Sequence, residues 1–292
     1  MNSNIIINIP HSSTYIPEPF LERVAINKEE LQQEVELLTD LYTDDLFANK
    51  DCNIIRADIS RIVCDMERFR DDSKEQMSNV GMGVIYTQTS KGKKLIEFDS
   101  EYRSTMLKEY YDSYYNKFEE LTSSILNRYG RCIIIDGHSF SVELLKRLRI
   151  PYKNSPDICI GFDDEFCDSD ILNILKQHFE KNGLAVALNY PYVGSIVPNR
   201  YYNKKDSRVK SLMIEVNKSI YLDDNNQKNE NYSKIKIIIQ KAIKKVLLHE
   251  KKYYSKWNRK INLIQGKKII IDWRVNKCQK KYLLFLIMMP KQ

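Results

Sequence analysis

The sequence predicts an α/β fold with a mostly parallel sheet, because apolar strand candidates alternate with helical segments along the chain. Two of these candidates, at residues 4–9 and 131–136, are rich in isoleucine, which is typical of strands buried on both faces of a sheet. A histidine and a serine follow closely after each run. Functional groups gather at the carboxyl ends of the strands in such sheets, so these two points are the first candidates for a site.

The first half of the chain alternates between extended and helical patterns. The strand at residues 4–9 ends at Pro10, and residues 22–50 are rich in helix formers with apolar residues at helical spacing. Thr39 or Asp40 is expected to restart that helix as an N-cap, which places Asp40 and Asp44 one turn apart on one helical face. The other elements expected here are extended segments at 53–64 and 81–89 and a helix at 98–128.

Shorter elements alternate in the second half. Residues 131–136 are the clearest strand, and they are expected to deliver Gly137, His138 and Ser139 at its carboxyl end. Residues 209–216 are apolar and carry Glu215 near their end. The remaining expected elements are strands at 158–161 and 184–188 and helices at 170–182 and 232–254.

Composition excludes several classes of protein. The chain has 292 residues, 42% of them hydrophobic and 29% charged, which suffices for an ordinary core. No apolar run approaches the roughly 20 residues of a membrane-spanning helix, and the N-terminus lacks the basic region of a signal peptide. The six cysteines form no CxxC pair. We therefore expect no membrane association, a cytoplasmic location and mostly buried thiols.

The net charge of +7 is concentrated at the C-terminus. Residues 255–292 hold ten Lys or Arg against one acid, Asp272, which gives +9 and leaves residues 1–254 at −2. We therefore expect a main domain at residues 1–254 and a basic extension at residues 255–292. The extension interleaves aromatic and basic side chains, so a nucleic-acid-binding protein is an alternative, although the apolar YLLFLIMM near its end fits such an arm poorly.

His11 and His138 are candidate zinc ligands, because they are the two of four histidines that come directly after apolar strands. A single histidine in such a place is more often structural, but two in matching contexts favour a shared role. Neutral imidazole is the commonest protein ligand for zinc, and catalytic zinc sites combine three protein ligands with one open position.

Acidic residues complete the candidate site. Asp40 or Asp44 could supply a third ligand, although an aspartate near a helix start is more often a cap. Asp136 could be a ligand or a hydrogen-bond partner of His138. Glu215 ends an apolar strand, where an unpaired carboxylate is costly. Beside a metal it could act as a general base, and otherwise it could be a solvated edge residue.

Seven motifs occur in the order, and near the spacing, of the N-formylglutamate amidohydrolase family, which the chain resembles over about residues 4–250. The motifs are IPHSS at 9–13, TDLYTDDLF at 39–47, SRIVCDMER at 60–68, IDGHSFS at 135–141, PDICIG at 156–161, NYPYVG at 189–194 and MIEVNKSIY at 213–221. The resemblance implies a three-layer α/β sandwich with a mostly parallel mixed sheet, like that of the zinc exopeptidases. It also implies a zinc-dependent amidohydrolase acting on an N-formylglutamate-like amino acid.

The resemblance assigns roles to individual residues. It implies that His11 and His138 bind Zn²⁺, with Asp40 as the preferred acidic ligand and Asp44 as its rival, and that Glu215 is the general base. Carboxypeptidase-like enzymes take a glutamate three residues after the first histidine as a ligand. Thr14 stands at that position here, so the third ligand departs from their pattern.

An N-acyl amino acid is an anion, and arginines suit its carboxylate because their planar fork matches it. The motif SRIVCDMER supplies Arg61 and Arg68, with Asp65 as a brace between them, and Arg200 matches a further basic position of the family. Related zinc peptidases or deacylases with another substrate, and a catalytically inactive relative, remain alternatives. The sequence does not indicate an oligomeric state.

Overall fold

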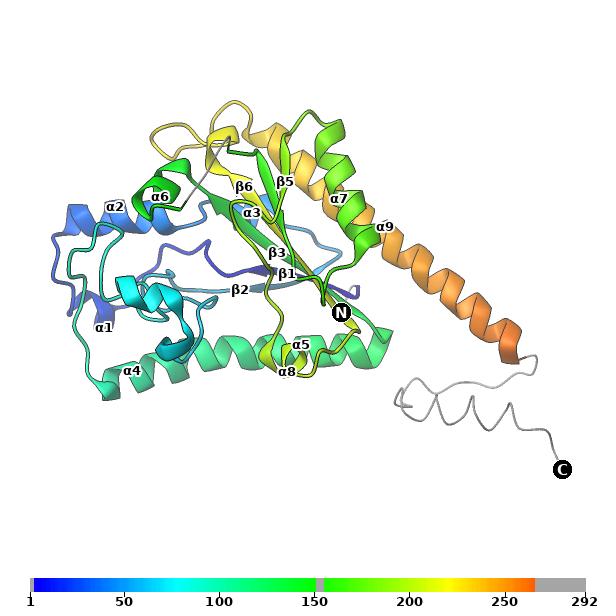
Figure 1. Ribbon diagram of the computed structural model, residues 1–292, viewed down its shortest axis with the longest axis horizontal. Helices are drawn as coiled ribbons and strands as arrows, with labels where there is room; N and C mark the ends of the chain where they lie inside the picture. The colour runs from blue at the N-terminus through cyan, green and yellow to red at the C-terminus, as the bar shows by residue number, and fades with distance from the viewer. Residues whose placement is uncertain (1–2, 151–154, 266–292) are drawn as a thin grey trace.

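A six-stranded sheet forms the centre of the computed structural model, which describes residues 3–150 and 155–265 and the side chains of the last helix as far as residue 255. The strand order is β2-β1-β3-β6-β4-β5, and helices cover both faces (Figure 1). The predicted α/β architecture with a mostly parallel mixed sheet is confirmed. The strands are β1 (Ile5–Ile9), β2 (Asn53–Arg56), β3 (Cys132–Phe140), β4 (Ile158–Gly161), β5 (Val186–Leu188) and β6 (Val209–Asn217).

The four strands β2, β1, β3 and β6 are parallel, so their carboxyl ends meet at one edge of the sheet. β4 then runs antiparallel to β6, and β5 is parallel to β4. The register pairs Asn8 with Asp136 and His138 with Glu215. Adjacent partners in a sheet point to the same face, so the polar side chains of β3 and β6 are placed side by side.

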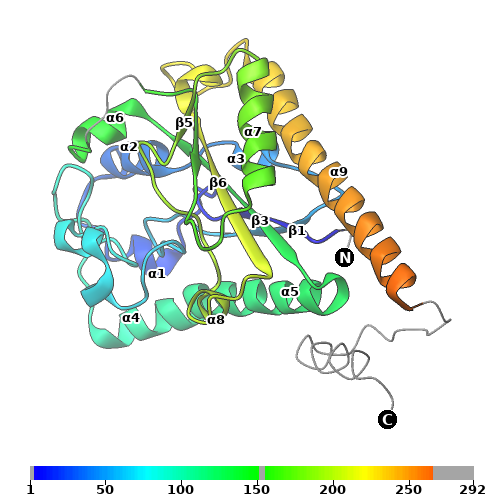
Figure 2. The ribbon, with the colours of Figure 1, turned by 45° about the vertical axis from the view of Figure 1, so that its right-hand side comes forward.

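Alternate residues of the central strands build two separate cores. Ile6 and Ile134 pack with α2 (Lys28–Leu38), α4 (Ser100–Met106) and α5 (Ser113–Tyr129) on one face. The neighbouring residues of the same strands pack on the other face with α3 (Thr43–Leu46), α7 (Ser169–Lys181) and α9 (Tyr232–Gln265). Figure 2 shows α5 and the pair α7 and α9 on opposite sides of the strands. This two-sided burial explains the isoleucine-rich strand sequences.

The expected helix at residues 22–50 is two helices. Asn27 caps α2 by accepting a hydrogen bond from the N–H of Glu30, and α2 ends at Leu38. Tyr42 precedes α3 with a φ of 65°, a left-handed conformation that interrupts the helical path. Asp40 lies between the helices, so the prediction that it shares a helical face with Asp44 was wrong.

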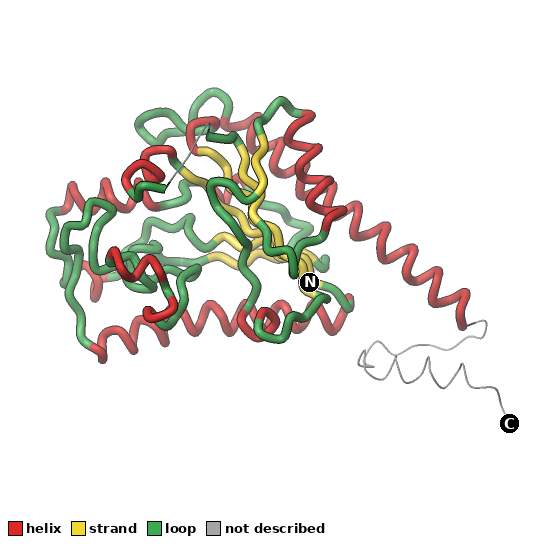
Figure 3. Tube along the Cα trace, viewed as in Figure 1, coloured by secondary structure: helices red, strands yellow, loops and turns green. Residues whose placement is uncertain are grey.

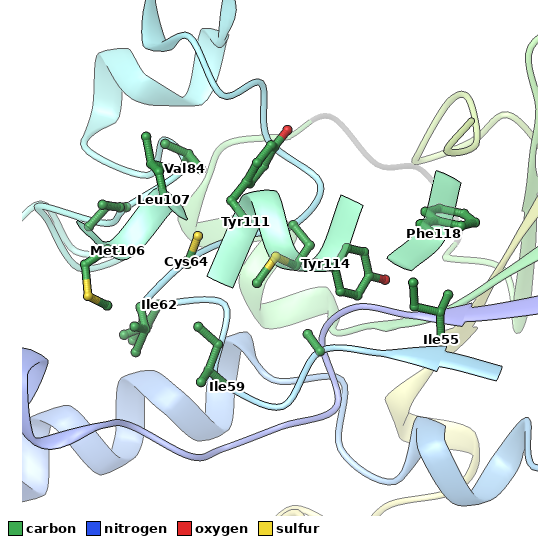
Figure 4. Packing of buried hydrophobic residues seen from close by; sticks show 14 of the residues in the cluster. Ile55, Ile59, Ile62, Cys64, Val84, Met106, Leu107, Tyr111, Tyr114 and Phe118 are labelled. Carbon is green, nitrogen blue, oxygen red and sulfur yellow. The ribbon is translucent and has the colours of Figure 1, made fainter. Parts of the chain in front are cut away.

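Two segments expected to be extended are largely loops. Only β2 forms within residues 53–64, and residues 81–89 make isolated bridges such as Met82 with Tyr86. Figure 4 shows Ile59 and Ile62 of the loop after β2 in the same apolar cluster as Tyr111. Their burial therefore comes from a loop packed against that cluster rather than from a strand.

Other elements differ from expectation in length or were not expected. The helical segment at 98–128 contains a π-helical turn, Leu107–Asp112, between α4 and α5. β3 continues through Phe140, so His138 lies within the strand rather than after it. The short helices that the sequence did not predict are α1 (Glu18–Leu21), α6 (Val142–Arg147) and α8 (Asn199–Tyr202).

The last described helix crosses the expected domain boundary. α9 runs without interruption through residues 254 and 255 to Gln265, as the continuous helical tube in Figure 3 shows. The rest of the predicted basic extension lies outside the described residues. Most of the basic and aromatic residues that suggested nucleic-acid binding belong to that part. None of the helices in the described part of the chain has the length and apolarity needed to cross a membrane.

Candidate active site

The carboxyl ends of β1, β3 and β6 bring three predicted residues together. His11 follows β1 by two residues, while His138 and Glu215 are register partners on β3 and β6. The two imidazole rings have centroids 5.0 Å apart, and both rings are almost fully buried. The two histidines, 127 positions apart in the sequence, therefore form one polar cluster with a buried glutamate beside it.

Asp40 reaches this cluster from the end of α2. Its N–H donates to the carbonyl of His11 at 2.9 Å, and its own carbonyl accepts the hydroxyl of Thr43 at 2.7 Å. Its Oδ2 lies 3.1 Å from Nδ1 of His138 and 3.7 Å from Nδ1 of His11. Asp44 instead lies on α3 with an exposed carboxylate 3.2 Å from Arg56. Of the two candidate acidic ligands, the fold brings only Asp40 to the histidines.

The outer nitrogen of each imidazole is held by a carboxylate. Nε2 of His11 lies 2.7 Å from Oδ1 of Asp65, and Nε2 of His138 lies 3.0 Å from Oδ1 of Asp136. Histidines that bind metals usually donate their second ring N–H to such a group, which fixes the tautomer. Nδ1 of His11 is buried and has no hydrogen-bond partner within the described chain. An unsatisfied nitrogen beside Asp40 fits a metal ion.

Glu67 is an acidic residue of the site that sequence reasoning missed. Its Oε2 lies 3.1 Å from Nε2 of His138, and His11, Glu67 and His138 offer ligand atoms that all lie within 4.8 Å of one another. This group could hold a metal ion. Glu67 stands two positions after Asp65 in the motif SRIVCDMER, so an acidic residue next to the predicted brace was a sequence signal for this role.

Burial and charge set the protonation of these groups. Burial raises the pKa of Glu215 to about 8, and its Oε2 has no hydrogen-bond partner in the described structure. Burial alone would raise the pKa of Asp40, but the adjacent imidazoles of His11 and His138 hold it well below its usual range. Burial alone would lower the pKa of His138, but the carboxylates of Glu67 and Asp136 raise it well above its usual range.

The site contains more carboxyl groups than cationic side chains. Within the described residues, five carboxyl groups lie in or directly beneath the cavity, against three arginine or lysine side chains. The carboxyl groups are those of Asp40, Asp65, Glu67, Asp136 and Glu215, and the cations are Arg61, Arg68 and Lys218. A divalent cation would compensate the carboxylates among them. Buried charges need such compensation, so the donor set fits a divalent metal ion.

The predicted arginine pair lies beside the histidines. Nε and Nη2 of Arg61 donate to Oδ2 of Asp65 at 3.0 and 2.8 Å, and the hydroxyl of Tyr86 donates to the same oxygen at 2.9 Å. Nε of Arg68 donates to the carbonyl of Met82 at 3.2 Å. Asp65 thus holds both Arg61 and His11, as the predicted brace should. Arg200 lies on α8, is exposed and does not line the cavity.

Lys218 is a second residue that sequence reasoning missed. It follows β6 and is buried, and its Nζ donates to the carbonyls of Leu37 and Thr39 at 3.0 and 2.6 Å. Burial lowers the pKa of this amine to about 8. The carbonyls at the end of α2 would otherwise lack donors. Lys218 therefore fixes the backbone immediately before Asp40.

A cavity of about 570 Å³ opens over these groups. Its floor is polar and includes His11, Asp40, His138 and Glu215, whereas much of its remaining wall is apolar. A buried polar cluster at the base of such a pocket is the usual arrangement of a small-molecule site. The site can hold a divalent cation and a carboxylate-bearing ligand. The carboxyl group of Glu215 can exchange a proton with a group bound there.

Comparisons with known proteins agree with the fold. The family model for N-formylglutamate amidohydrolase matches residues 3–222. The structure of N-formylglutamate amidohydrolase from Ralstonia eutropha JMP134 is similar, with a TM-score of 0.75, 17% identity, and coverage of 86% of this chain and 95% of that one. A gene product of Agrobacterium tumefaciens is similar with a TM-score of 0.57, 16% identity, and coverage of 84% and 92%. No protein with a curated description matches the sequence.

Proposed function

The chain belongs to the N-formylglutamate amidohydrolase family, and on that premise we propose that it is a zinc-dependent enzyme that hydrolyses the amide bond of an N-acyl amino acid. The observation that carries the proposal is the meeting of His11, His138 and acidic side chains at one buried point, with Glu215 beside them. The nucleophile would be water. A cytoplasmic location remains a prediction.

The proposed ligands are His11 and His138 through their Nδ1 atoms, with Asp40 as the third. Three observations favour this set over one that includes Glu67. Asp40 faces both Nδ1 atoms, both Nε2 atoms already have carboxylate partners, and Nδ1 of His11 otherwise has none in the described chain. Glu67, on the Nε2 side of His138, would then support that imidazole together with Asp136.

Zinc in this position would lower the pKa of a bound water toward about 7 and polarise the substrate carbonyl. Glu215 would accept the proton of the attacking water; its buried carboxyl group beside His138, with one oxygen that has no partner in the described structure, supports this role. The same carboxyl group then donates the proton to the leaving amine. The bond broken is the amide C–N bond, and the products are a carboxylate and an amine.

Arg61 and Arg68 are proposed to hold the carboxylate of the substrate. Both guanidinium groups line the cavity beside His11, and Asp65 fixes Arg61 through two hydrogen bonds. A planar fork that is already oriented loses little entropy when it binds a carboxylate. Arg200 is the third arginine predicted to bind the substrate. It is exposed on α8, which favours a role at the surface.

The test is hydrolysis by the purified protein before and after metal removal. We expect formate release from N-formyl amino acids, its loss on chelation and its recovery with Zn²⁺. Asp40→Asn should lower zinc affinity by about 10- to 100-fold more than the matched variant Glu67→Gln. Failure of every N-acyl amino acid and peptide to react with the zinc-loaded protein would contradict the proposed function. A larger loss of zinc affinity in Glu67→Gln would move the third ligand to Glu67.

A further inference from the structure

We propose that this site takes an amide with one carboxylate and one apolar substituent, rather than a dicarboxylate such as N-formylglutamate. The inference rests on the proposed amidohydrolase function, and it concerns the part of the substrate that does not react. Two features of the cavity carry it: the cationic groups that remain available for a carboxylate, and the apolar side chains of the lining.

The cations of the cavity can accommodate one carboxylate. Within the described lining, Nζ of Lys218 is buried and donates two of its three N–H groups to backbone carbonyls, and Nε and Nη2 of Arg61 donate to Asp65. Nε of Arg68 is bound to Met82, which leaves its two terminal nitrogens without an acceptor in the described chain. Arg68, with the remaining edge of Arg61, thus forms one anion site. These lining residues include no second guanidinium group for another carboxylate, and Lys218 is already engaged at the end of α2.

Neutral donors of the lining do not supply the missing positive charge. The hydroxyls of Ser195 and Ser211 pair with each other at 2.6 Å, whereas those of Ser139 and Ser141 can still donate but carry no charge. Four carboxylates already line the cavity. A second substrate carboxylate would therefore lose water without gaining a cationic partner, and it would be repelled by its surroundings.

Apolar side chains of the lining suit an apolar group. Three segments contribute them: the stretch between β2 and α4, the region of α6, and the loop between β5 and α8. The side chains involved are Phe69, Met77, Met82, Leu144, Leu148 and Val193. Phe69 is 57% exposed and Val193 is 73% exposed. Exposed apolar side chains at a pocket mouth commonly mark a binding surface for an apolar partner or ligand.

The volume of the cavity supports the same conclusion. Its 570 Å³ lies within the range of about 300–1,000 Å³ that is usual for small-molecule pockets, so it has room for an apolar substituent beside the reacting amide. Methionine side chains at positions 77 and 82 are unbranched and can adapt to apolar groups of different shapes. An apolar substituent could belong either to the amino acid or to the acyl group, and both would use the same wall.

The experiment compares binding and turnover of three ligands by the zinc-loaded protein. N-formyl-L-methionine places the apolar group on the amino acid, N-hexanoylglycine places it on the acyl group, and N-formyl-L-glutamate carries a second carboxylate. We expect at least one apolar monocarboxylate to exceed N-formylglutamate by about tenfold or more, both in affinity by calorimetry and in kcat/KM. Whichever of the two apolar ligands binds more tightly and has the higher kcat/KM shows whether the apolar side chains contact the amino acid or the acyl group of the substrate.

A variant at the pocket mouth provides the matched control. Val193→Lys adds a cation to the wall, whereas Val193→Gln adds polarity and length without charge. We expect Val193→Lys to shift the glutamate-to-methionine affinity ratio toward glutamate by about tenfold relative to Val193→Gln, because it supplies the missing partner.

The outcomes separate this inference from the proposed function. Affinity for N-formylglutamate equal to or above that for both apolar ligands would overturn the inference, even if formate is released. Equal ratios for the two Val193 variants would overturn it as well. Preferential binding of an apolar monocarboxylate without any hydrolysis would support the inference and contradict the proposed function.

Discussion

Replacement of Glu215 by glutamine should stabilise the metal-free protein while abolishing its chemistry. Burial raises the pKa of this carboxyl group to about 8 from an ordinary value of 4.5, so the folded state disfavours the charged form. The stability that the neutral carboxyl group contributes is fully present below pH 4.5, and it is lost as the pH rises through 8. The loss is about 3 kcal/mol at pH 7 and approaches about 5 kcal/mol above pH 8. The glutamine side chain does not titrate, so its contribution to the free energy of unfolding does not change with pH.

Urea unfolding of the metal-free proteins between pH 5 and pH 9 measures this difference. The free energy of unfolding of Glu215→Gln should rise relative to the parent as the pH increases, with a difference of several kcal/mol at the alkaline end. The zinc-loaded variant should retain its metal, with kcat reduced by about 10²- to 10⁴-fold. Parallel stability profiles for the two proteins, or turnover at the parent rate, would refute the reasoning.

Three further variants test the groups around the metal site. Lys218→Met removes both donors to the carbonyls before Asp40, so zinc affinity measured by chelator competition should fall by about 10- to 100-fold; unchanged affinity would exclude a positioning role. Arg68→Lys keeps the charge but loses the fork, so steady-state kinetics should show KM raised by about tenfold with a smaller change in kcat; a change confined to kcat would contradict this assignment. Tyr114→Phe removes a hydroxyl that donates to Asn8, which in turn donates to Asp136 at 2.8 Å. Urea unfolding should show a loss of about 1–2 kcal/mol, and an unaltered midpoint would rule out that contribution.

The sequence predicted the parts of the site that depend on strand order and local pattern. His11, His138 and Glu215 stand on or directly after apolar strands, and parallel strands of one sheet place such residues at a common edge. The register between β3 and β6 then sets His138 beside Glu215. The apolar runs alone were sufficient to predict these strands, because helices cover both faces of the sheet and the strand residues are therefore apolar on both sides.

Residues placed by long-range contacts could not be predicted in the same way. Lys218 acts on carbonyls about 180 positions earlier in the chain, and no local pattern indicates that contact. Glu67 approaches His138 because the loop after β2 is packed against the apolar cluster that includes Tyr111. The same packing gives that loop the alternating apolar pattern of a strand, which accounts for the incorrect prediction at residues 53–64.

The central claim is that His11 and His138 bind one divalent ion beside Glu215. The most direct measurement is the metal content of the purified, zinc-repleted protein by mass spectrometry, compared with that of His138→Ala. The account predicts about one equivalent of zinc per chain in the parent and almost none in the variant. A parent protein without stoichiometric metal, or a folded His138→Ala variant that retains it, would contradict the account.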